Sequence, residues 1–304
     1  METLQKALAD IQENMPSLDL RENEPMKEHC SFKIGGPVTA FAAPKDIWEL
    51  TRLFYYLHMN NVAPLVIGKG TNIIIPDEGL DICVVSTENL TKLRLGETEN
   101  TIYAEAGVSL ARLAQFAQQN GLAGLEFASG IPGSVGGGVL MNAGAYGGEM
   151  KDVVFRTEYL DADGRLQTVN GDAHDFAYRH SVFSDRDCLV LRTSMKLAPG
   201  RHEDIAARMR ELGAKRRASQ PLDMPSAGST FKRPVGGYAA ALIDEAGLKG
   251  FRIGGAQVSE KHAGFVVNAG GASFDDVLRL MEHIQKTVYE RSGIELVPEV
   301  KIIH

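Results

Sequence analysis

The residues from Gly130 to Gly148 constrain this chain more than any other segment, because eight of the nineteen are glycine. Glycine loses much conformational freedom on folding, so this density is tolerated where the backbone needs positive φ or close approach to another group. Glycine N–H groups can surround a phosphate without side-chain interference, and a helix that begins at the loop's end adds its positive dipole end. A flexible linker is the alternative, but linkers are monotonous in Gly and Ser, whereas Ile131, Pro132 and Tyr146 interrupt this segment. The segment therefore predicts a phosphate-binding loop.

Length and composition are typical of a globular protein. A chain of 304 residues favours about two domains, and a hydrophobic content of 44% can give each a core. No apolar run approaches the ~18 residues that a membrane helix needs, so we expect no membrane insertion. The N-terminal residues alternate charged and apolar side chains at helical spacing, without the basic region and apolar stretch of a secretory leader. They predict an amphipathic helix.

Charge and cysteine usage narrow the classes of partner. The net charge of −7 argues against nucleic-acid binding, which needs a basic field. An anionic ligand must therefore be met by local positive groups. Cys30, Cys83 and Cys188 lie far apart, are odd in number and lack C-x-x-C spacing, so neither a disulfide framework nor a zinc site is expected. This usage favours a reducing cytoplasm.

Other ionisable residues suggest no metal. The eight histidines include no H-E-x-x-H pair, and Asp161-Ala-Asp-Gly164 carries only the opening of a calcium loop. We interpret 161–164 as a hairpin turn. His262 is interpreted as a hydrogen-bonded core histidine rather than a ligand, and Lys215-Arg-Arg217 as a solvated helix face.

Hydrophobic patterning indicates mixed α+β structure. Between Phe41 and Leu197, short β-branched runs alternate with helical stretches at Lys45–Asn60 and Ser109–Gly121. The character changes after Pro199, where a second domain is expected to begin. The elements expected there are helices at 201–219, 238–246 and 274–291, a C-cap at Ser292-Gly293 and a strand-like tail at 300–303.

A second glycine loop lies within Val66-Ile-Gly-Lys-Gly-Thr-Asn-Ile-Ile-Ile-Pro76. It is not a dinucleotide fingerprint, because that motif needs a third glycine and an immediate helix, and the Ile-Ile-Ile-Pro that follows cannot begin one. A Walker loop is also absent. A strand–turn–strand anion nest remains, with Lys69, Thr71 and Asn72 available to a ligand; a plain hairpin is the alternative. Together with the loop at 130–138, it predicts two cradles that hold a diphosphate between them.

Polar motifs offer further chemistry at Tyr178-Arg-His-Ser181, at Gly228-Ser-Thr-Phe-Lys-Arg-Pro234 and at Pro298-Glu299. The Arg179 guanidinium stays charged and can fork onto a carboxylate or enolate. The second motif places the Ser229 hydroxyl beside two cations. The residues alone leave plainer alternatives open: a surface ion pair for Arg179, a capping or turn serine for Ser229 and a solvated carboxylate for Glu299.

Taken together, these motifs resemble those of the UDP-N-acetylenolpyruvoylglucosamine reductase (MurB) family, flavoenzymes that complete UDP-N-acetylmuramate for bacterial cell walls. The resemblance spans most of the chain. The short C-terminal part, which ends soon after Glu299, is similar to the compact subtype that lacks an extra substrate-covering loop. The matching motifs are Ser31-Phe-Lys-Ile-Gly-Gly-Pro37, Gly68-Lys-Gly-Thr-Asn72, Gly130-Ile-Pro-Gly-Ser-Val-Gly-Gly137, Met141-Asn-Ala-Gly-Ala-Tyr-Gly147, Tyr178-Arg-His-Ser181, Gly228-Ser-Thr-Phe-Lys232, His262-Ala-Gly-Phe265 and Pro298-Glu-Val300.

The resemblance implies an FAD-binding fold of the vanillyl-alcohol-oxidase type with two α+β subdomains, followed by a smaller α+β substrate domain. It implies an N-terminal helix and lead-in at 1–32, an FAD-binding domain at 33–198 with a subdomain boundary near 96, and a C-terminal substrate-binding domain at 199–304. FAD is expected to bind noncovalently, with its pyrophosphate against the two glycine loops. The residues implied for FAD are Gly68, Lys69, Gly70, Thr71, Asn72, Gly130, Gly133, Ser134, Val135, Gly136, Gly137, Ala143 and Gly144.

The resemblance also implies NADPH-dependent reduction of UDP-N-acetylglucosamine enolpyruvate to UDP-N-acetylmuramate in peptidoglycan synthesis. Negative charge develops on the α-carbon and carboxylate of the substrate, and Arg179 is implied to stabilise it. Ser229 is implied to protonate that carbon. Glu299 is implied to assist, either as a protonated acid on the substrate carboxylate or by holding Arg179. The residues implied for substrate binding are Tyr178, Lys232 and, where the family commonly has Asn, Arg233.

Two other functions stay open at this point. One is an oxidase on the same flavin fold that hands electrons to oxygen. The other is a noncatalytic nucleotide-binding protein whose glycine loops hold a ligand structurally. We expect a cytoplasmic monomer or weak oligomer whose partners are NADPH and the enolpyruvyl substrate.

Overall fold

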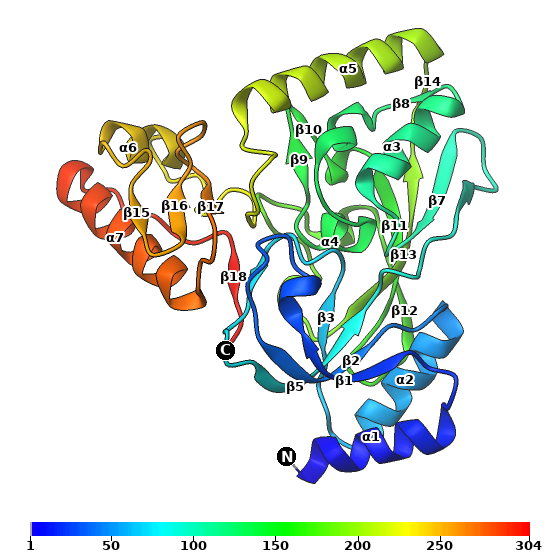
Figure 1. Cartoon of the computed structure of the whole chain (residues 1–304). Helices are drawn as coiled ribbons and strands as arrows, with labels where there is room; N and C mark the ends of the chain where they lie inside the picture. Colours follow the sequence, from blue (N-terminus) through cyan, green and yellow to red (C-terminus); the bar gives the residue numbers. More distant parts are fainter. Residues whose placement is uncertain (1) are drawn as a thin grey trace. The chain divides into compact units, whose positions relative to one another are not determined.

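The computed structural model describes residues 2–304, which divide into two compact units (Figure 1). The first unit contains the chain up to Glu22 together with Ala40–Lys69 and Ile82–Lys215. The second unit contains Asn23–Thr39, Gly70–Asp81 and Arg216–His304. Both units combine helices and strands, which confirms the α+β class. No helix within 2–304 is long and apolar enough to cross a membrane.

A five-stranded antiparallel sheet forms the centre of the first unit. Its strand order is β12-β11-β13-β7-β6. The Asp161 N–H donates to the Arg165 carbonyl at 3.0 Å between β11 and β12, which confirms the predicted hairpin turn. The strands are β6 (Leu93–Leu95), β7 (Thr101–Glu105), β11 (Val154–Leu160), β12 (Leu166–Asn170) and β13 (Leu189–Lys196).

Two helices that begin at serine caps pack with this sheet. The Ser109 side chain accepts the Arg112 N–H at the start of α3 (Leu110–Gln119), and Ser134 accepts the Gly137 N–H at the start of α4 (Val135–Leu140). A capping hydroxyl satisfies a backbone donor that the first helical turn leaves unpaired. The sheet and helices share one hydrophobic core, whose fully or nearly fully buried members include Ile102, Leu113, Val139, Phe183 and Met195.

A four-stranded sheet has the order β1-β2-β5-β3, and its last two strands are parallel. Three of its strands, β1 (Leu20–Pro25), β2 (Pro37–Ala42) and β5 (Leu80–Ser86), contribute residues to both units, and β3 (Leu65–Ile67) belongs to the first. Helices α1 (Glu2–Asn14) and α2 (Ile47–Met59) share a core in the first unit that includes Leu8, Leu53, Leu57 and Val85. The amphipathic N-terminal helix is thereby confirmed for the described residues.

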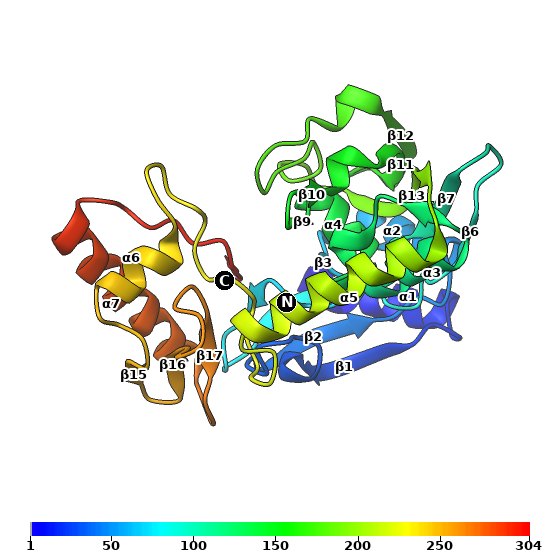
Figure 2. The same ribbon diagram turned by 90° about the horizontal axis from the view of Figure 1, so that it is seen from above.

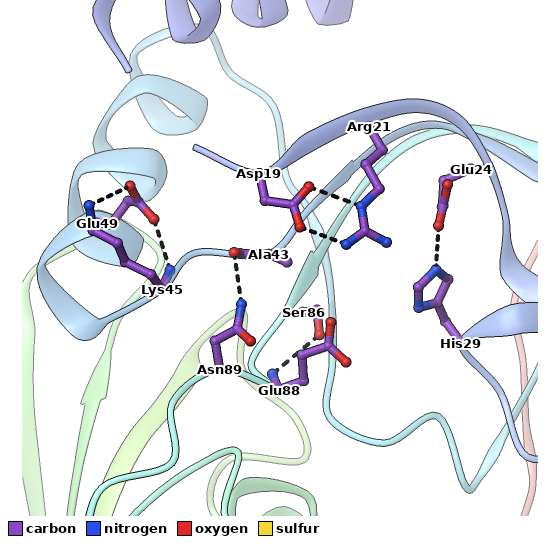
Figure 3. Close-up of polar contacts among 10 residues, drawn as sticks. All are labelled: Asp19, Arg21, Glu24, His29, Ala43, Lys45, Glu49, Ser86, Glu88 and Asn89. Atoms are coloured by element: carbon purple, nitrogen blue, oxygen red, sulfur yellow. Dashed lines mark hydrogen bonds and ion pairs between the residues drawn. The ribbon is translucent and has the colours of Figure 1, made fainter. Parts of the chain in front are cut away.

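Polar contacts fix the beginning of α2 (Figure 3). Asp46 caps the helix by accepting the Glu49 N–H at 2.8 Å, and Glu49 in turn accepts the Lys45 N–H at 2.8 Å. The Asn89 amide donates to the Ala43 carbonyl at 3.1 Å and so fastens the approach to the helix. The chain at 43–49 is therefore held in one conformation.

The second unit packs α6 (Ala239–Glu245) and α7 (Phe274–Ser292) beside a small antiparallel sheet, β15-β16-β17, as Figure 2 shows. Gly293 follows α7 with φ +70°, so the predicted C-cap is confirmed. The C-terminal strand β18 (Lys301–Ile302) pairs in parallel with β4 (Ile73–Ile74). The sheet strands are Arg252–Ile253, Ala256–Val258 and Val266–Asn268, and the core includes Ile243, Val258, Leu280 and Ile284.

The remaining elements are short, except for α5 (His202–Ser219). The predicted domain limits at 32, 96 and 198 do not coincide with the limits of the compact units, which interleave three segments each; these limits stay predictions. The short elements are β8 (Leu122–Ala123), β9 (Gly144–Ala145), β10 (Gly148–Glu149) and β14 (Ala198–Pro199), with 3₁₀ turns at Met26–Glu28, Glu126–Gly130, Met150–Asp152 and Gly171–His174.

His174 is buried in the first unit, and we expect it to make stability depend on pH. Its Nδ1–H donates to the Gly171 carbonyl at 2.8 Å, and its Nε2 lies 2.9 Å from the Thr157 hydroxyl. Burial lowers the pKa of His174. As pH falls below the ordinary value of about 6.5, the unfolded chain gains a proton that the folded one resists. The stabilisation that neutral His174 contributes is therefore fully present above that pH, and it is lost as the pH falls through the lowered pKa of the folded state.

Thermal denaturation at pH 5.5 and 7.5 tests this, and we expect the lower melting temperature at pH 5.5. A His174→Asn variant should show a smaller difference between the two pH values, because it cannot titrate. His202→Asn, at an exposed histidine of α5, is the control. If the pH dependence of the melting temperature is unchanged in His174→Asn, His174 is not its cause.

Candidate functional site

The two predicted glycine loops meet in the first unit at Gly68 and Ser134. A Cβ atom added to Gly68 would lie 2.2 Å from the Ser134 Oγ and 3.3 Å from its Cβ. The plain hairpin alternative for the first loop is wrong, because β3 pairs with β5 whereas β4 pairs with β18. The loop therefore passes between two different sheets.

Packing accounts for part of the glycine density in the second loop. An added Cβ would lie 2.9 Å from the Ala106 Cβ at Gly136 and 3.2 Å from Leu110 at Gly138, so these positions bring α4 close to its neighbours. Gly137 differs, because it is exposed and an added Cβ would meet only the Ser134 Oγ, at 3.6 Å. Its open side leaves room for a ligand at the start of α4.

The first loop continues into the second unit after Lys69. Gly70 has φ +56°, and an added Cβ would lie 2.0 Å from the His29 carbonyl oxygen, so only glycine fits. The Asn72 amide donates to the Glu299 carbonyl at 3.1 Å, and the Asn72 carbonyl accepts the Lys301 N–H at 2.9 Å. Asn72 thus holds the C-terminal strand in addition to any contact with a ligand.

Arg179 lies in a tight turn of the first unit. The backbone groups of Ala177 and His180 exchange hydrogen bonds of 3.1 and 3.2 Å, which leaves Tyr178 and Arg179 at the tip. Arg179 has φ +55°, in the left-handed region that non-glycine residues rarely adopt. Its guanidinium lies 5.4 Å from the centre of the Tyr178 ring.

Asn142 and Ser181 attach this turn to the second glycine loop. The Asn142 amide donates to the Ala177 carbonyl at 3.1 Å, and its oxygen accepts the Lys151 N–H at 2.9 Å. The Ser181 hydroxyl donates to the Leu140 carbonyl at 2.8 Å. Asn142 is 2% exposed and has φ +43°. Both residues belong to the motifs of the sequence analysis, but no role was predicted for either, since their contacts depend on the fold.

Ser229 and Glu299 lie on adjacent segments of the second unit. The Glu299 N–H donates to the Thr230 carbonyl at 2.9 Å, Phe231 and Pro298 form a β-bridge, and the Lys232 N–H donates to the Val297 carbonyl at 2.8 Å. The structure therefore brings the serine motif beside the C-terminal carboxylate, although 70 residues separate them in sequence.

Lys232 and Arg233 follow on the same segment, and both are exposed. The Arg233 guanidinium lies 4.0 Å from the centre of the Tyr238 ring, a cation–π contact that holds an arginine without removing its charge. Arg233 therefore does not simply extend into solvent.

The cysteine thiols, His262 and possible metal ligands are the remaining candidate groups. Burial raises the pKa of Cys83 to about 12 and that of Cys188 to about 11, so both thiols stay protonated near neutral pH. The half-buried His262 accepts the Gly264 N–H at its Nδ1, which supports its interpretation as a structural histidine. Within residues 2–304, no group of three or more His, Cys, Asp or Glu residues could hold a metal ion.

The contact at Gly68 fits a nucleotide diphosphate. The backbone at Gly137 has an open side, and uncovered glycine backbone can present N–H groups to an anion. The Ser134 side chain brings Gly68 of the first loop beside this place. The residues present are thus compatible with the pyrophosphate of FAD at this place.

Comparison with known proteins identifies the family. Residues 38–170 match an FAD binding domain, and residues 220–303 match the C-terminal domain of UDP-N-acetylenolpyruvoylglucosamine reductase. The reductase of Caldanaerobacter subterraneus is 49% identical over 281 residues, which cover 92% of both chains. The chain belongs to the UDP-N-acetylenolpyruvoylglucosamine reductase (MurB) family. The reductase of Syntrophomonas wolfei is 45% identical over 97% of this chain and 98% of its own.

A solved structure agrees with this assignment. The MurB reductase of Thermus caldophilus superposes with a TM-score of 0.80 at 33% identity, and the match covers 94% of this chain and 99% of that one. The predicted fold, an FAD-binding domain followed by a MurB C-terminal domain, is confirmed. The activity class is that of an FAD-dependent MurB oxidoreductase of peptidoglycan precursor synthesis. The compact subtype stays a prediction.

The Gly68 contact predicts a specific loss and rescue of FAD binding. In Gly68→Ala the new methyl group displaces Ser134, and overpacking of this kind costs about 1–3 kcal/mol. We expect this cost to fall on the FAD-bound state, so that the FAD dissociation constant rises roughly 5- to 150-fold. Ser134→Gly in the same chain removes the clashing atoms, so the double variant should bind FAD more tightly than Gly68→Ala alone.

Fluorescence titration of the apoprotein with FAD measures both variants. Gly96→Ala is the matched control, because its added Cβ would lie 2.1 Å from the Thr101 Oγ1 in the same unit but in neither glycine loop. Unchanged FAD binding in Gly68→Ala, or a double variant no better than that single variant, would contradict the proposed place of the pyrophosphate.

Proposed function

We propose that this chain reduces the enolpyruvyl ether of UDP-N-acetylglucosamine enolpyruvate to UDP-N-acetylmuramate, with FAD bound noncovalently and NADPH as hydride donor. FAD, when bound, supplies the hydride acceptor and donor that links NADPH to the vinyl carbon of the substrate. The 49% identity to a reductase along 92% of the chain carries the choice of reaction. We place the protein in the cytoplasm as a monomer or weak oligomer of the compact subtype.

The cofactor is held at the two glycine loops in this proposal. The backbone of Gly68–Asn72 and of Gly130–Gly137 faces the pyrophosphate, and the exposed Lys69 adds a positive charge. Val135, Ala143 and Gly144 complete the contacts with FAD. The support is the meeting of the loops at Gly68 and Ser134 and the open side of Gly137.

Arg179 is proposed to stabilise the negative charge that develops on the α-carbon and carboxylate of the substrate. A guanidinium fixed before the reaction stabilises such charge without reorganising. The supporting observation is the short turn that holds Arg179 at φ +55°. Tyr178, at the same tip, is proposed to contact the substrate.

Ser229 is proposed to give its hydroxyl proton to the α-carbon. A serine is a weak acid, but the carbanion-like carbon is a strong base, so the transfer is favourable. Glu299 assists, and its support is the backbone pairing that places it beside the Ser229–Thr230 segment. Lys232 and Arg233 are proposed to bind the diphosphate of the substrate. Lys232 would do so through the compact charge of its ammonium group, and Arg233 through paired hydrogen bonds from its guanidinium.

An anaerobic spectrum tests the proposed function. The purified protein is reduced with NADPH and then mixed with the enolpyruvyl substrate, while the visible absorbance of the flavin is followed. Prompt recovery of the oxidised spectrum supports the reductase. A protein that bleaches with NADPH but recovers only when air is admitted would be an oxidase on the same fold, and a colourless protein that cannot be reconstituted would be a noncatalytic binder.

Asn142 is expected to act as a positioning residue for Arg179. In Asn142→Asp the carboxylate can still accept the Lys151 N–H, but it no longer donates to the Ala177 carbonyl, which keeps only the His180 N–H. Loss of one hydrogen bond costs about 0.5–1.5 kcal/mol, so reduction of the substrate should slow roughly 2- to 10-fold while NADPH oxidation in the first half-reaction is unchanged. Stopped-flow absorbance separates the two halves.

Asn170→Asp, at an exposed position of β12, is the control for the added charge. Equal slowing of both half-reactions in Asn142→Asp would indicate a general loss of structure instead of a misplaced Arg179.

A further inference from the structure

A pocket of about 570 Å³ lies in the first unit, among residues that the proposed cofactor and substrate sites do not use. Its size is in the range of pockets that hold small molecules. It includes neither glycine loop and neither residue of the Tyr178–Arg179 tip. The lining residues are Asp46, Ile47, Trp48, Thr91, Lys92, Leu93, Arg94, Tyr103, Glu105, Arg112 and Arg192.

Four cations line the pocket, and its two carboxylates are already engaged. Glu105 is 3% exposed and accepts the Lys92 N–H at 2.9 Å, while the Lys92 Nζ lies 3.9 Å from it. Asp46 is the N-cap of α2 and accepts the Glu49 N–H. The charge of Arg192 is neutralised by Glu158, which does not line the pocket; the Arg192 Nε donates to Glu158 at 2.6 Å.

Arg94 and Arg112 keep their charge uncompensated. Among residues 2–304, neither guanidinium forms an ion pair with a carboxylate. Both are nevertheless held in place: Arg94 lies 4.3 Å from the centre of the Tyr103 ring, and the Arg112 Nη1 donates to the Thr91 carbonyl at 3.2 Å. Fixed guanidinium groups bind phosphate through paired hydrogen bonds. In a chain of net charge −7, such a local positive site can attract an anion.

Trp48 supplies an aromatic surface in the same pocket. It is the only tryptophan of the chain, and its side chain is 74% exposed although most tryptophans are largely buried. The Tyr103 ring is already covered by Arg94, so Trp48 is the ring with an available face. Planar bases stack on such faces in nucleotide-binding proteins.

We propose that this pocket is a second nucleotide site, which binds a nucleoside diphosphate with its base on Trp48 and its phosphates on Arg94 and Arg112. The site is separate from the places proposed for FAD, NADPH and the enolpyruvyl substrate. It does not depend on the proposed function, because none of its residues takes part in that reaction.

Trp48 fluorescence provides a direct assay. The holoenzyme, with FAD bound, is titrated with ADP while tryptophan emission is followed, both with and without saturating UDP-N-acetylmuramate. Calorimetry gives an independent binding curve. We expect saturable quenching with a dissociation constant below 1 mM. Adenosine has the base but no phosphates, and inorganic pyrophosphate has the phosphates but no base, so each should bind at least tenfold more weakly than ADP.

Two variants and a control decide the assignment. Arg94→Gln combined with Arg112→Gln should weaken ADP binding at least tenfold, and Trp48→Leu should do the same by calorimetry. Arg201→Gln, at an exposed arginine near Asp204, should bind ADP as the wild type does. A dissociation constant for ADP above 1 mM, or binding that survives the Arg94 and Arg112 changes, would overturn the proposal. Reduction of the enolpyruvyl substrate can fail or succeed without altering this outcome.

Discussion

Replacing Ser229 with alanine is expected to leave flavin reduction by NADPH at its normal rate and to slow the substrate half-reaction roughly 10²- to 10⁴-fold, as loss of a general acid does. Only the second half-reaction requires a proton at the α-carbon. The Ser229 side chain is half-buried on the segment that pairs with Glu299, so its removal takes away a hydroxyl without disturbing the backbone pairing. Rapid-mixing absorbance with NADPH, and then with the enolpyruvyl substrate, measures the halves separately.

Ser226→Ala is the matched control for this variant. Ser226 lies three residues earlier, and it is the carbonyl of Ser226 that accepts the Ser31 hydroxyl, so the alanine variant keeps this bond. It should reduce substrate at the wild-type rate. If Ser229→Ala slows both half-reactions equally, the serine is not the proton donor.

Local signals account for most of the helices. Ser109 and Ser273 each precede an apolar periodic stretch, and both cap the helices that begin after them. Gly293 ends α7 in the left-handed conformation, which glycine adopts without steric cost. Such signals lie within a few residues of the structure they specify, so the sequence alone contains them.

Contacts between distant segments could not be predicted in the same way. The pairing of β4 with β18 joins residues more than 200 positions apart, and no local pattern specifies it. Gly136 is required by its approach to Ala106, and this reason differs from the predicted phosphate cradle. The role of Asn142 likewise depends on the place of Ala177 in the fold. Packing and long-range hydrogen bonds thus decide the parts that pattern reasoning leaves open.

Family motifs extended the prediction further than physical patterns did. Before the resemblance, the surface ion pair and the capping serine were open alternatives for Arg179 and Ser229. In the structure the motifs of Ser229 and Glu299 lie on paired segments, which is compatible with a shared site but does not specify their roles. The assignment of these roles therefore depends on kinetic tests.

Arg179→Lys is expected to lower the rate of substrate reduction about 10²- to 10³-fold, the range seen when one preorganised electrostatic donor is lost. Lysine keeps the positive charge, but its compact ammonium cannot form the planar fork of a guanidinium. The turn between Ala177 and His180 accepts either side chain, because both residues meet the same left-handed backbone at φ +55°. The rate of flavin reoxidation by the enolpyruvyl substrate, measured without oxygen, is the readout.

Arg179→Gly separates the chemical role of this residue from a structural one. A left-handed backbone costs a non-glycine residue roughly 1–2 kcal/mol, so glycine should keep or raise the melting temperature. The same variant should lose substrate reduction at least as completely as Arg179→Lys, because the charge is gone. If Arg179 only shaped the turn, the glycine variant would be stable and active, and near-normal turnover in either variant would contradict electrostatic stabilisation by this guanidinium. We therefore expect Arg179→Gly to gain stability and to lose activity. Backbone strain at a functional residue persists because the reaction needs that side chain.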